Sequence, residues 1–211
     1  MVITRDEVIS WIKAYSHVIE ENKDYLTELD SAIGDADHGA NMQRGFQAVL
    51  AKLPAVEDKD IGTILKTVGM TLISTVGGAG GPLYGTFFIQ AGATLNEKME
   101  LTLADWVAAL EAGINGVVKI GKASVGDKTM IDALTPAVQA LNGSSGQELS
   151  MSEALKKSAK AAEEGMKGTI PLVARKGRAS YLGERSAGHQ DPGATSSFLL
   201  LDTAVNVWAK H

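Results

Sequence analysis

The sequence predicts an all-α protein in which eight helices form an antiparallel up-and-down bundle, or barrel, and in which residues 1–211 make up a single domain. Apolar residues recur with the 3.6-residue period of a helix along most of the chain. Three of these segments open on a Ser or Thr that is followed three residues later by Asp or Glu, the pattern of a capping box. The alternation that marks a half-buried strand occurs only weakly, at residues 170–173.

The first four helices fall in the first half of the chain. Thr4 and Glu7 form a capping box, and apolar residues on one helical face follow it. The second helix is predicted over about residues 38–53 and stops at Pro54. The third covers about residues 58–76. The fourth begins at Pro82, because proline suits the first turn of a helix.

The other four helices follow from the same signals. Thr102 and Asp105 cap a fifth helix that runs to about residue 119. The sixth is predicted over about residues 129–141. Ser150 and Glu153 open a seventh, to about residue 167, and the eighth covers about residues 194–209.

The composition is that of an ordinary globular protein and excludes several other classes. The chain has 211 residues, of which 45% are hydrophobic and 21% charged, and a folded chain of this length buries roughly 70% of its unfolded surface. Disorder is excluded as the main state, and the lack of cysteine excludes a disulfide-built secreted scaffold. The net charge of −5 argues against a nucleic-acid partner, because phosphate backbones require a basic surface.

No segment of the sequence predicts a membrane association. The first residues lack the basic and apolar regions of a signal peptide. Residues 67–96 contain no charge, but a glycine-rich stretch at 77–81 divides them into halves of about 15 residues, and a span needs roughly 20. We therefore expect a cytoplasmic protein that does not bind membranes.

The order of the loops predicts that one end of the bundle carries the function. Short connections make successive helices antiparallel, so that the first, third, fifth and seventh loops lie at one end. These loops hold clustered aspartates, a run of glycines and several arginines. The loops of the other end, at 54–57, 98–101 and 143–149, are short and chemically plain.

The first loop contains three carboxylates within a short stretch, Asp30, Asp35 and Asp37. Such groups repel one another unless a cation lies between them, and hard oxygen ligands suit Mg²⁺. The alternative is a solvated turn that caps the next helix. An EF-hand is excluded, because Ala40 and Phe46 stand where its glycine and glutamate would be.

The third and fifth loops each have two interpretations. The glycines of 77–81 lead into a helix N-terminus, which favours phosphate binding, and a tight turn is the alternative. The fifth loop resembles a P-loop at 116–123, but it follows a helix and has Ala123 in place of the hydroxyl residue, so a P-loop is excluded. Met130 either belongs to the core or lines a purine site.

The seventh loop, at 168–193, is far longer than a bundle connection requires. It carries Arg175, Arg178 and Arg185, whose guanidinium groups match phosphate oxygens, although a solvated basic loop is the alternative. His38 and His189 alone indicate little. Together the four loops predict a site for Mg²⁺ and a nucleotide. The sequence has no catalytic triad and no thiol, which agrees with phosphoryl transfer, because that reaction depends on positioning and charge neutralisation.

Four motifs resemble those of the dihydroxyacetone kinase L family over essentially the whole chain. They are Gly34-Asp35-Ala36-Asp37-His38-Gly39 with Asn41-Met42, the Gly77–Pro82 loop, 175–186 and 188–194. The resemblance implies a helical barrel with the nucleotide site at one end and two Mg²⁺ ions held by Asp30, Asp35 and Asp37. The residues that it places at ADP or ATP are His38, Gly39, Ala40, Asn41, Ala79, Gly80, Gly121, Met130, Arg178, Asp191, Pro192 and Gly193. Arg178 and His38 are also implied to act in catalysis.

The resemblance also implies an activity and partners. Bound ADP would accept a phosphoryl group from a phosphohistidine on an M subunit, and the resulting ATP would pass it to dihydroxyacetone on a K subunit. A homodimer and contact with a transcriptional regulator are further expectations.

One departure from the family is Gly80, where the family loop often has serine. The alternatives are a kinase module that exchanges ATP at each turnover, a nucleotide-sensing regulatory subunit and a Mg²⁺-dependent phosphohydrolase.

Overall fold

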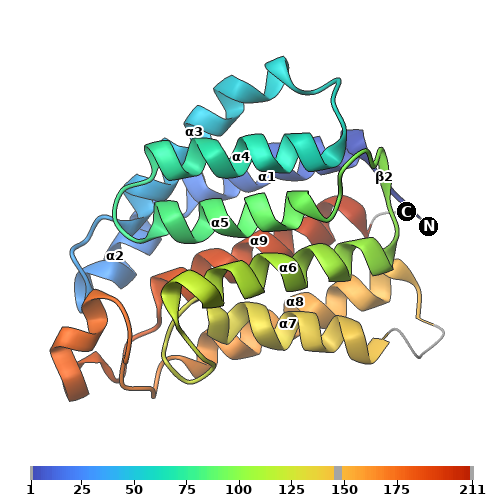
Figure 1. Ribbon diagram of the computed structural model, residues 1–211. Helices are drawn as coiled ribbons and strands as arrows, with labels where there is room; N and C mark the ends of the chain where they lie inside the picture. The colour runs from blue at the N-terminus through green and yellow to red at the C-terminus, as the bar shows by residue number, and fades with distance from the viewer. Residues whose placement is uncertain (1, 145–148, 210–211) are drawn as a thin grey trace.

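The computed structural model describes residues 2–144 and 149–209, and the chain is almost entirely helical within these ranges (Figure 1). The elements are β1 (Ile3–Thr4), α1 (Arg5–Glu21), α2 (Lys23–Ile33), α3 (His38–Lys52), η1 (Leu53–Ala55), α4 (Ile61–Thr75), α5 (Gly80–Ala93), β2 (Glu100–Leu101), α6 (Leu103–Gly121), α7 (Ile131–Ser144), α8 (Met151–Gly168), η2 (Arg178–Ser186) and α9 (Pro192–Trp208). The predicted all-α class is confirmed.

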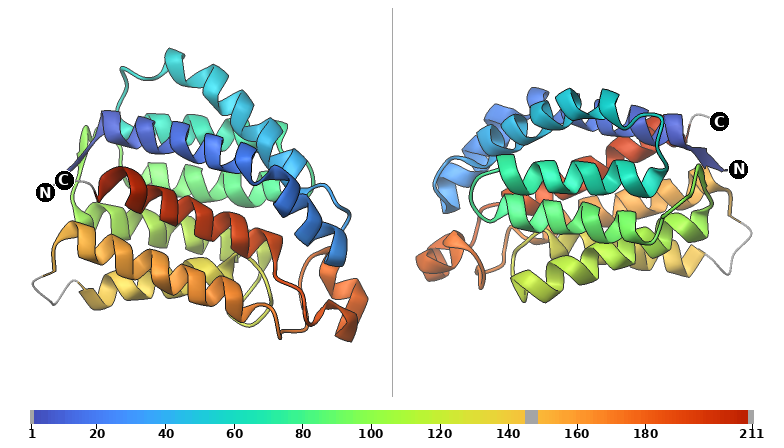
Figure 2. Two further views of the ribbon diagram at one scale, coloured as in Figure 1. Left: turned by 180° about the vertical axis from the view of Figure 1, so that it is seen from behind. Right: turned by 45° about the horizontal axis from the view of Figure 1, so that its top comes forward.

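The helices pack mainly against their neighbours in sequence. Each helix contacts the next one along the chain, and α1 also contacts α9. Figure 2 shows these first and last long helices side by side. The only strands in the described residues are β1 and β2, which pair antiparallel at the end of the bundle where both termini lie (Figure 1).

The predicted first helix is two helices, which raises the number of α-helices in the described ranges from the predicted eight to nine. The break falls at Asn22, whose backbone leaves the helical region and whose side-chain amide donates to the Val18 carbonyl at 2.8 Å. A second correction concerns Asp30, which lies in the last turn of α2 and not in a loop. Asp30 therefore has a fixed backbone, which a loop would not give it.

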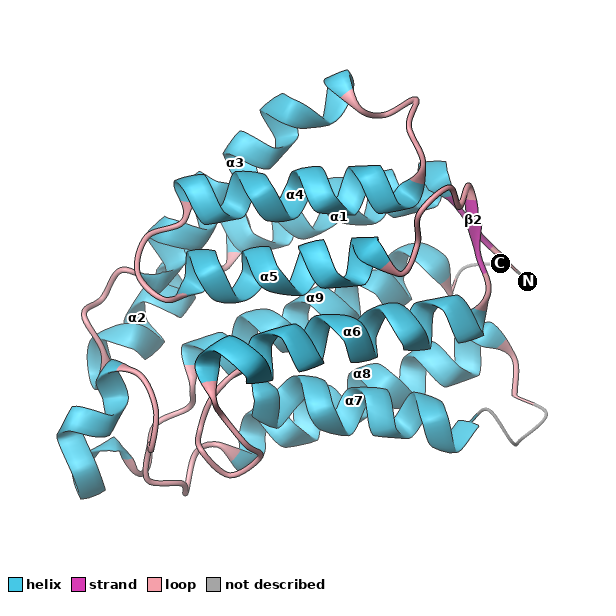
Figure 3. Cartoon of the chain, in the orientation of Figure 1, coloured by secondary structure: helices cyan, strands magenta, loops and turns pink. Residues whose placement is uncertain are grey.

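The weak strand pattern at 170–173 is wrong, because the structure has turns and coil there. Figure 3 shows the same segment as loop between α8 and η2. Of the connection predicted at 143–149, residues 145–148 lie outside the described part of the chain. No described helix has the length and apolarity that crossing a bilayer requires.

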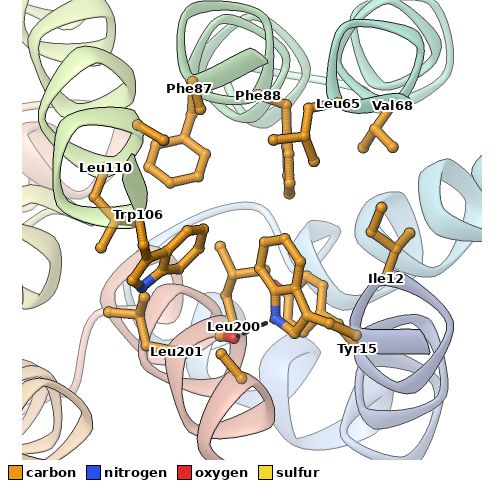
Figure 4. Close-up of a cluster of buried hydrophobic side chains, with 14 of the residues drawn as sticks. Ile12, Tyr15, Leu65, Val68, Phe87, Phe88, Trp106, Leu110, Leu200 and Leu201 are labelled. Atoms are coloured by element: carbon orange, nitrogen blue, oxygen red, sulfur yellow. Dashed lines mark hydrogen bonds between the residues drawn. The ribbon is translucent and has the colours of Figure 1, made fainter. Parts of the chain in front are cut away.

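Aromatic side chains from several helices fill the centre of the bundle. Trp106 packs edge-on against Trp11 and Trp208, with ring centroids 5.4 and 5.0 Å away, and such pairs contribute about 0.5–1.5 kcal/mol beyond their burial. The indole N–H of Trp11 donates to the Leu200 carbonyl at 3.0 Å, which satisfies its one polar atom. Figure 4 shows Phe88, Trp106 and Leu200 pointing into this shared centre.

The charge-free segment forms α4 and α5, which pack together closely. A Cβ on Gly69 would lie 2.5 Å from the Gly85 carbonyl oxygen, and one on Gly92 would lie 2.7 Å from that of Gly62. Glycine is required at these crossings because the two backbones approach within the space of a side chain. The pair turns back through residues 76–79, at the end of the bundle opposite the termini (Figure 1).

Candidate functional site

One end of the bundle contains a cavity of about 800 Å³. Its walls come from the α2–α3, α4–α5, α6–α7 and α8–α9 connections and from the helix ends beside them. Figure 3 shows these connections at the end away from the termini. The structure thus agrees with the prediction, made from helix direction alone, that these four loops meet.

Three carboxylates converge on this cavity. One ligand atom from each of Asp30, Asp35 and Asp37 lies within 4.8 Å of the other two. Asp30 is buried at the end of α2, and its Oδ2 accepts hydrogen bonds from the Asp37 and His38 amides at 2.8 and 3.1 Å. These two bonds fix the short turn between α2 and α3.

The carboxylate of Asp37 is not used as a helix cap. Asp37 occupies the N-cap position of α3, yet its side chain makes no capping hydrogen bond. A solvated capping turn, the alternative interpretation of this loop, would use that carboxylate on the first amides of α3. Clustered carboxylate oxygens with one uncommitted member fit a hard divalent cation such as Mg²⁺.

The glycine-rich turn lines the same cavity as the carboxylates. Gly78 has φ of 63°, and α5 begins at Gly80 after an Ala79 that makes no side-chain cap. A helix whose first turn lacks a side-chain cap leaves amides for another acceptor, and its dipole favours an anion there. A Cβ on Gly80 would meet only Val76 Cγ1, at 3.2 Å.

The long α8–α9 connection contains the short helix η2, whose first residues line the cavity. Arg178, the first residue of η2, contacts the α2–α3 turn, where its Nε donates to Asp35 Oδ2 at 2.9 Å. Its side chain is 67% exposed, so solvent screens this pair and it contributes little stability. The guanidinium therefore lies at the carboxylate cluster with most of its donors open to the cavity or to solvent.

His38 and Asn41 project from the first turn of α3. His38 Nε2 lies 2.9 Å from the Ser196 hydroxyl of α9, and Asn41 Oδ1 accepts from Arg44 at 2.7 Å. Burial lowers the pKa of His38, and the charges of Asp30 and Asp37 oppose that effect. The ring is consequently neutral at neutral pH in the ligand-free protein.

The structure brings nearly all the predicted site residues to the cavity. Its lining includes Asp30, Asp35, Asp37, His38, Asn41, Ala79, Gly80, Gly121, Met130, Arg178, Asp191, Pro192 and Gly193. Gly39 and Ala40 do not line it. Ala40 is exposed, and Gly39 packs against α2, where a Cβ would lie 2.0 Å from the Lys23 carbonyl oxygen.

Gly39→Ala is expected to lower the free energy of unfolding by about 1–3 kcal/mol, because the added methyl forces α2 and α3 apart. Equilibrium urea unfolding measures this effect. Gly168→Ala is the control, since nothing lies within 4 Å of that Cβ position, and we expect it to be neutral or slightly stabilising. Equal stability of both variants would contradict the packing role of Gly39.

Sequence reasoning missed several buried polar residues around the cavity. Lys128 is 1% exposed, and its ammonium donates to the carbonyls of Thr169 at 2.9 Å, Leu172 at 3.1 Å and His189. Asp132 accepts from the Gly126 and Thr129 amides and holds the α6–α7 connection. Both follow the rejected P-loop in sequence. Asp132 lies three residues after Thr129, the spacing of a capping box, whereas no spacing signal marks Lys128.

Asp191 is a buried carboxyl with an unusual affinity for its proton. Burial raises its pKa to about 7, although the hydrogen bond that Oδ2 accepts from the Ala194 amide at 2.7 Å acts in the opposite direction. The charge of Asp132 raises the pKa further, and that of Lys128 lowers it. In the folded protein the Asp191 carboxyl therefore loses its proton only near neutral pH.

The stability of the metal-free protein is expected to fall by about 2 kcal/mol between pH 5 and pH 7 through Asp191 alone. Its folded pKa lies above the unfolded value, so the unfolded chain loses this proton first as the pH rises. Asp191→Asn removes this contribution while keeping an N-cap oxygen. The difference between wild-type and variant unfolding free energies, measured in chelator at both pH values, isolates it. Parallel curves would contradict the raised pKa.

The fold and the cavity together define an all-helical protein with an acidic, glycine-lined site for a divalent cation and a phosphate-bearing ligand. The DAK2 domain family model matches residues 32–206. The chain therefore belongs to the DAK2 domain family.

Curated relatives match almost the whole chain. It is 51% identical over 201 residues to the ADP-binding subunit DhaL of the PEP-dependent dihydroxyacetone kinase of Escherichia coli (strain K12), covering 95% of this chain and 96% of the relative. It is 41% identical to the ADP-binding subunit DhaL of the PTS-dependent enzyme of Lactococcus lactis subsp. lactis (strain IL1403), covering 99% and 100%.

Solved structures show the same fold. The dihydroxyacetone kinase of C. freundii in its native form superposes with a TM-score of 0.73 at 24% identity, covering 94% of this chain and 34% of the kinase. The same kinase in complex with AMP-PNP and Mg²⁺ gives a TM-score of 0.71. This chain thus spans about a third of that longer enzyme.

Proposed function

We propose that the chain is the ADP-binding subunit of a cytoplasmic, phosphotransferase-system-dependent dihydroxyacetone kinase. The observation that carries the proposal is the gathering of three aspartates, a glycine-lined helix start and Arg178 around one cavity. The relatives named as ADP-binding subunits match 95% and 99% of this chain, which supports the same role for it.

The residues of the cavity have separate roles in this proposal. Asp30, Asp35 and Asp37 would hold Mg²⁺, as two ions by the family resemblance. The amides of Ala79 and Gly80 at the start of α5 would bind phosphate oxygens. The remaining predicted contacts would bind the rest of the nucleotide, with Met130 and Gly121 beside the base.

Phosphoryl transfer depends on positioning and on stabilising the charge of the transferred group. Arg178 can reach that group, because its guanidinium contacts Asp35 of the carboxylate cluster. His38, held at the start of α3, would donate to a phosphate oxygen. Bound Mg²⁺ and ADP would supply the charge neutralisation and the phosphoryl acceptor. The chain needs no sugar site, since a K subunit would hold dihydroxyacetone and an M subunit would supply the phosphoryl group.

The proposal predicts that ADP remains bound through purification. Retention for hours requires a dissociation rate below about 10⁻⁴ s⁻¹, which corresponds to a Kd of about 0.1 nM at an association rate of about 10⁶ M⁻¹s⁻¹. Ultraviolet absorbance of the purified protein, followed by acid release and chromatography, identifies the nucleotide. Exchange of added ADP within minutes in excess Mg²⁺ would contradict a resident nucleotide.

The enzymatic alternatives differ in their turnover requirements. A kinase module that exchanges ATP would sustain many turnovers with ATP and the K subunit alone, and a phosphohydrolase would release phosphate from ATP steadily. A resident ADP that does not exchange predicts no sustained turnover with ATP and the K subunit alone, and no steady release of phosphate from ATP.

Two expectations concern further partners. Pull-downs with ADP-loaded and ATP-loaded protein test the predicted contact with a transcriptional regulator, which requires binding in one state only. Sedimentation velocity tests the predicted homodimer.

A further inference from the structure

A chain of buried hydroxyl groups connects the interior of the bundle to His38. Ser196 Oγ lies 2.9 Å from His38 Nε2 and 2.7 Å from the Tyr84 hydroxyl, and the Tyr84 hydroxyl lies 3.0 Å from Ser197 Oγ. Ser196 and Ser197 are completely buried, and Tyr84 is 1% exposed. The mechanism above uses none of these three residues.

The other polar atoms near Ser196 accept hydrogen bonds only. They are the carbonyl oxygens of Pro192, at 3.0 Å, and Gly193, at 3.2 Å. The single proton of the Ser196 hydroxyl therefore has three kinds of acceptor, a backbone carbonyl of α9, the Tyr84 hydroxyl oxygen or His38 Nε2. When Ser196 donates to His38, Tyr84 can donate to Ser196 Oγ, so the serine oxygen keeps a donor in that arrangement.

The direction of the Ser196 proton decides what His38 presents to the cavity. A neutral imidazole carries its proton on one nitrogen only. If Ser196 donates to Nε2, the proton lies on Nδ1, which has no hydrogen-bond partner in the described part of the chain and is the nitrogen left for a ligand. Phosphate oxygens only accept hydrogen bonds, so an Nδ1–H is required for a favourable contact.

We infer that Ser196, supported by Tyr84, is a positioning residue that holds the His38 ring and selects its Nδ1–H form, so that Nδ1 donates to a phosphate oxygen of the bound nucleotide. This inference rests on the proposed function, because the acceptor is the nucleotide. Ser196 itself is completely buried behind the ring and acts through His38.

The test uses the full chain loaded with Mg²⁺ and ADP. Nitrogen-15 NMR of the histidine rings distinguishes the two tautomers from the doubly protonated ring. Wild-type protein is expected to show His38 as Nδ1–H. Ser196→Ala is expected to lose this preference and to release ADP about tenfold faster, the effect of one hydrogen bond to a charged acceptor. Release is followed by displacement of a fluorescent ADP analogue with excess ADP.

Ser197→Ala is the matched control, because it removes an equally buried α9 hydroxyl that contacts Tyr84 and not His38. We expect it to keep the Nδ1–H form and the wild-type release rate. An Nε2–H or doubly protonated ring in ADP-loaded wild-type protein overturns the inference without any variant. Identical spectra and release rates for wild-type protein and Ser196→Ala also overturn it, while leaving the proposed function intact. Failure of wild-type protein to bind ADP at all overturns both.

Discussion

Asp37→Asn is expected to release the bound nucleotide roughly a hundredfold faster than wild-type protein. The cation and the phosphates are held jointly, so removing one of the three carboxylates weakens both. Asp37 is the clearest position for this test, because its carboxylate makes no capping hydrogen bond and its amide, which bonds to Asp30, is unchanged by the substitution. Metal affinity by calorimetry and ADP release by fluorescence measure the two effects.

The same variant has the opposite expected effect on the ligand-free protein. Three carboxylates within 4.8 Å of one another repel when no cation lies between them. In chelator, Asp37→Asn is therefore expected to be at least as stable as wild-type protein, and with Mg²⁺ and ADP to be less stable. Glu28→Gln removes one exposed charge from the middle of α2 and serves as control. Unchanged ADP retention in Asp37→Asn would remove Asp37 from the metal site.

The sequence predicts the meeting of the four loops because helix direction alone decides it. One miscounted helix would move every later loop to the other end, and the predicted first helix is in fact two. The miscount does not change the predicted loop positions, because the bend at Asn22 does not reverse the direction of the chain. Helix α2 continues toward the same end of the bundle as α1 (Figure 1). The parity of the later loops is preserved.

The local boundaries are predicted less well than the arrangement. The sequence predicts Asp30 in a loop, but Asp30 lies in α2, because the helix continues to Ile33 before Gly34 ends it. A Cβ at Gly34 would lie 2.1 Å from Asp30 Oδ1, so the tight turn depends on that glycine. The glycine is visible in the sequence, while its contact with Asp30 exists only in the folded chain.

The buried polar residues behind the site could not be predicted from spacing. In the sequence, Ser196 is one of several small residues in an apolar helix. Its proposed role depends on its contact with His38, which lies 158 residues earlier in the chain. The sequence around Lys128 is typical of an exposed turn. The backbone carbonyls that accept its hydrogen bonds lie 41–61 residues later in the chain. Such pairs are set by helix packing, which a local pattern does not contain.

Lys128→Met is expected to lower the free energy of unfolding by about 3–5 kcal/mol. Methionine has a similar length and fills the same space, but it leaves the carbonyls of Thr169, Leu172 and His189 buried without their donor. Burial lowers the pKa of Lys128, and the nearby Asp191 carboxyl opposes this effect. The ammonium is thus held by oriented carbonyl dipoles more than by an ion pair.

These carbonyls belong to the two ends of the α8–α9 connection, so Lys128 also fixes the segment that carries Arg178 and Asp191. Amide hydrogen exchange is expected to rise in residues 169–191 of Lys128→Met before it rises in the core helices, since loss of the ammonium opens this connection locally. Lys119→Met, which changes an exposed lysine near the end of α6, is the control and is expected to change stability by less than about 0.5 kcal/mol. If exchange in Lys128→Met increased uniformly along the chain, Lys128 would contribute to overall stability without specifically holding the loop over the cavity.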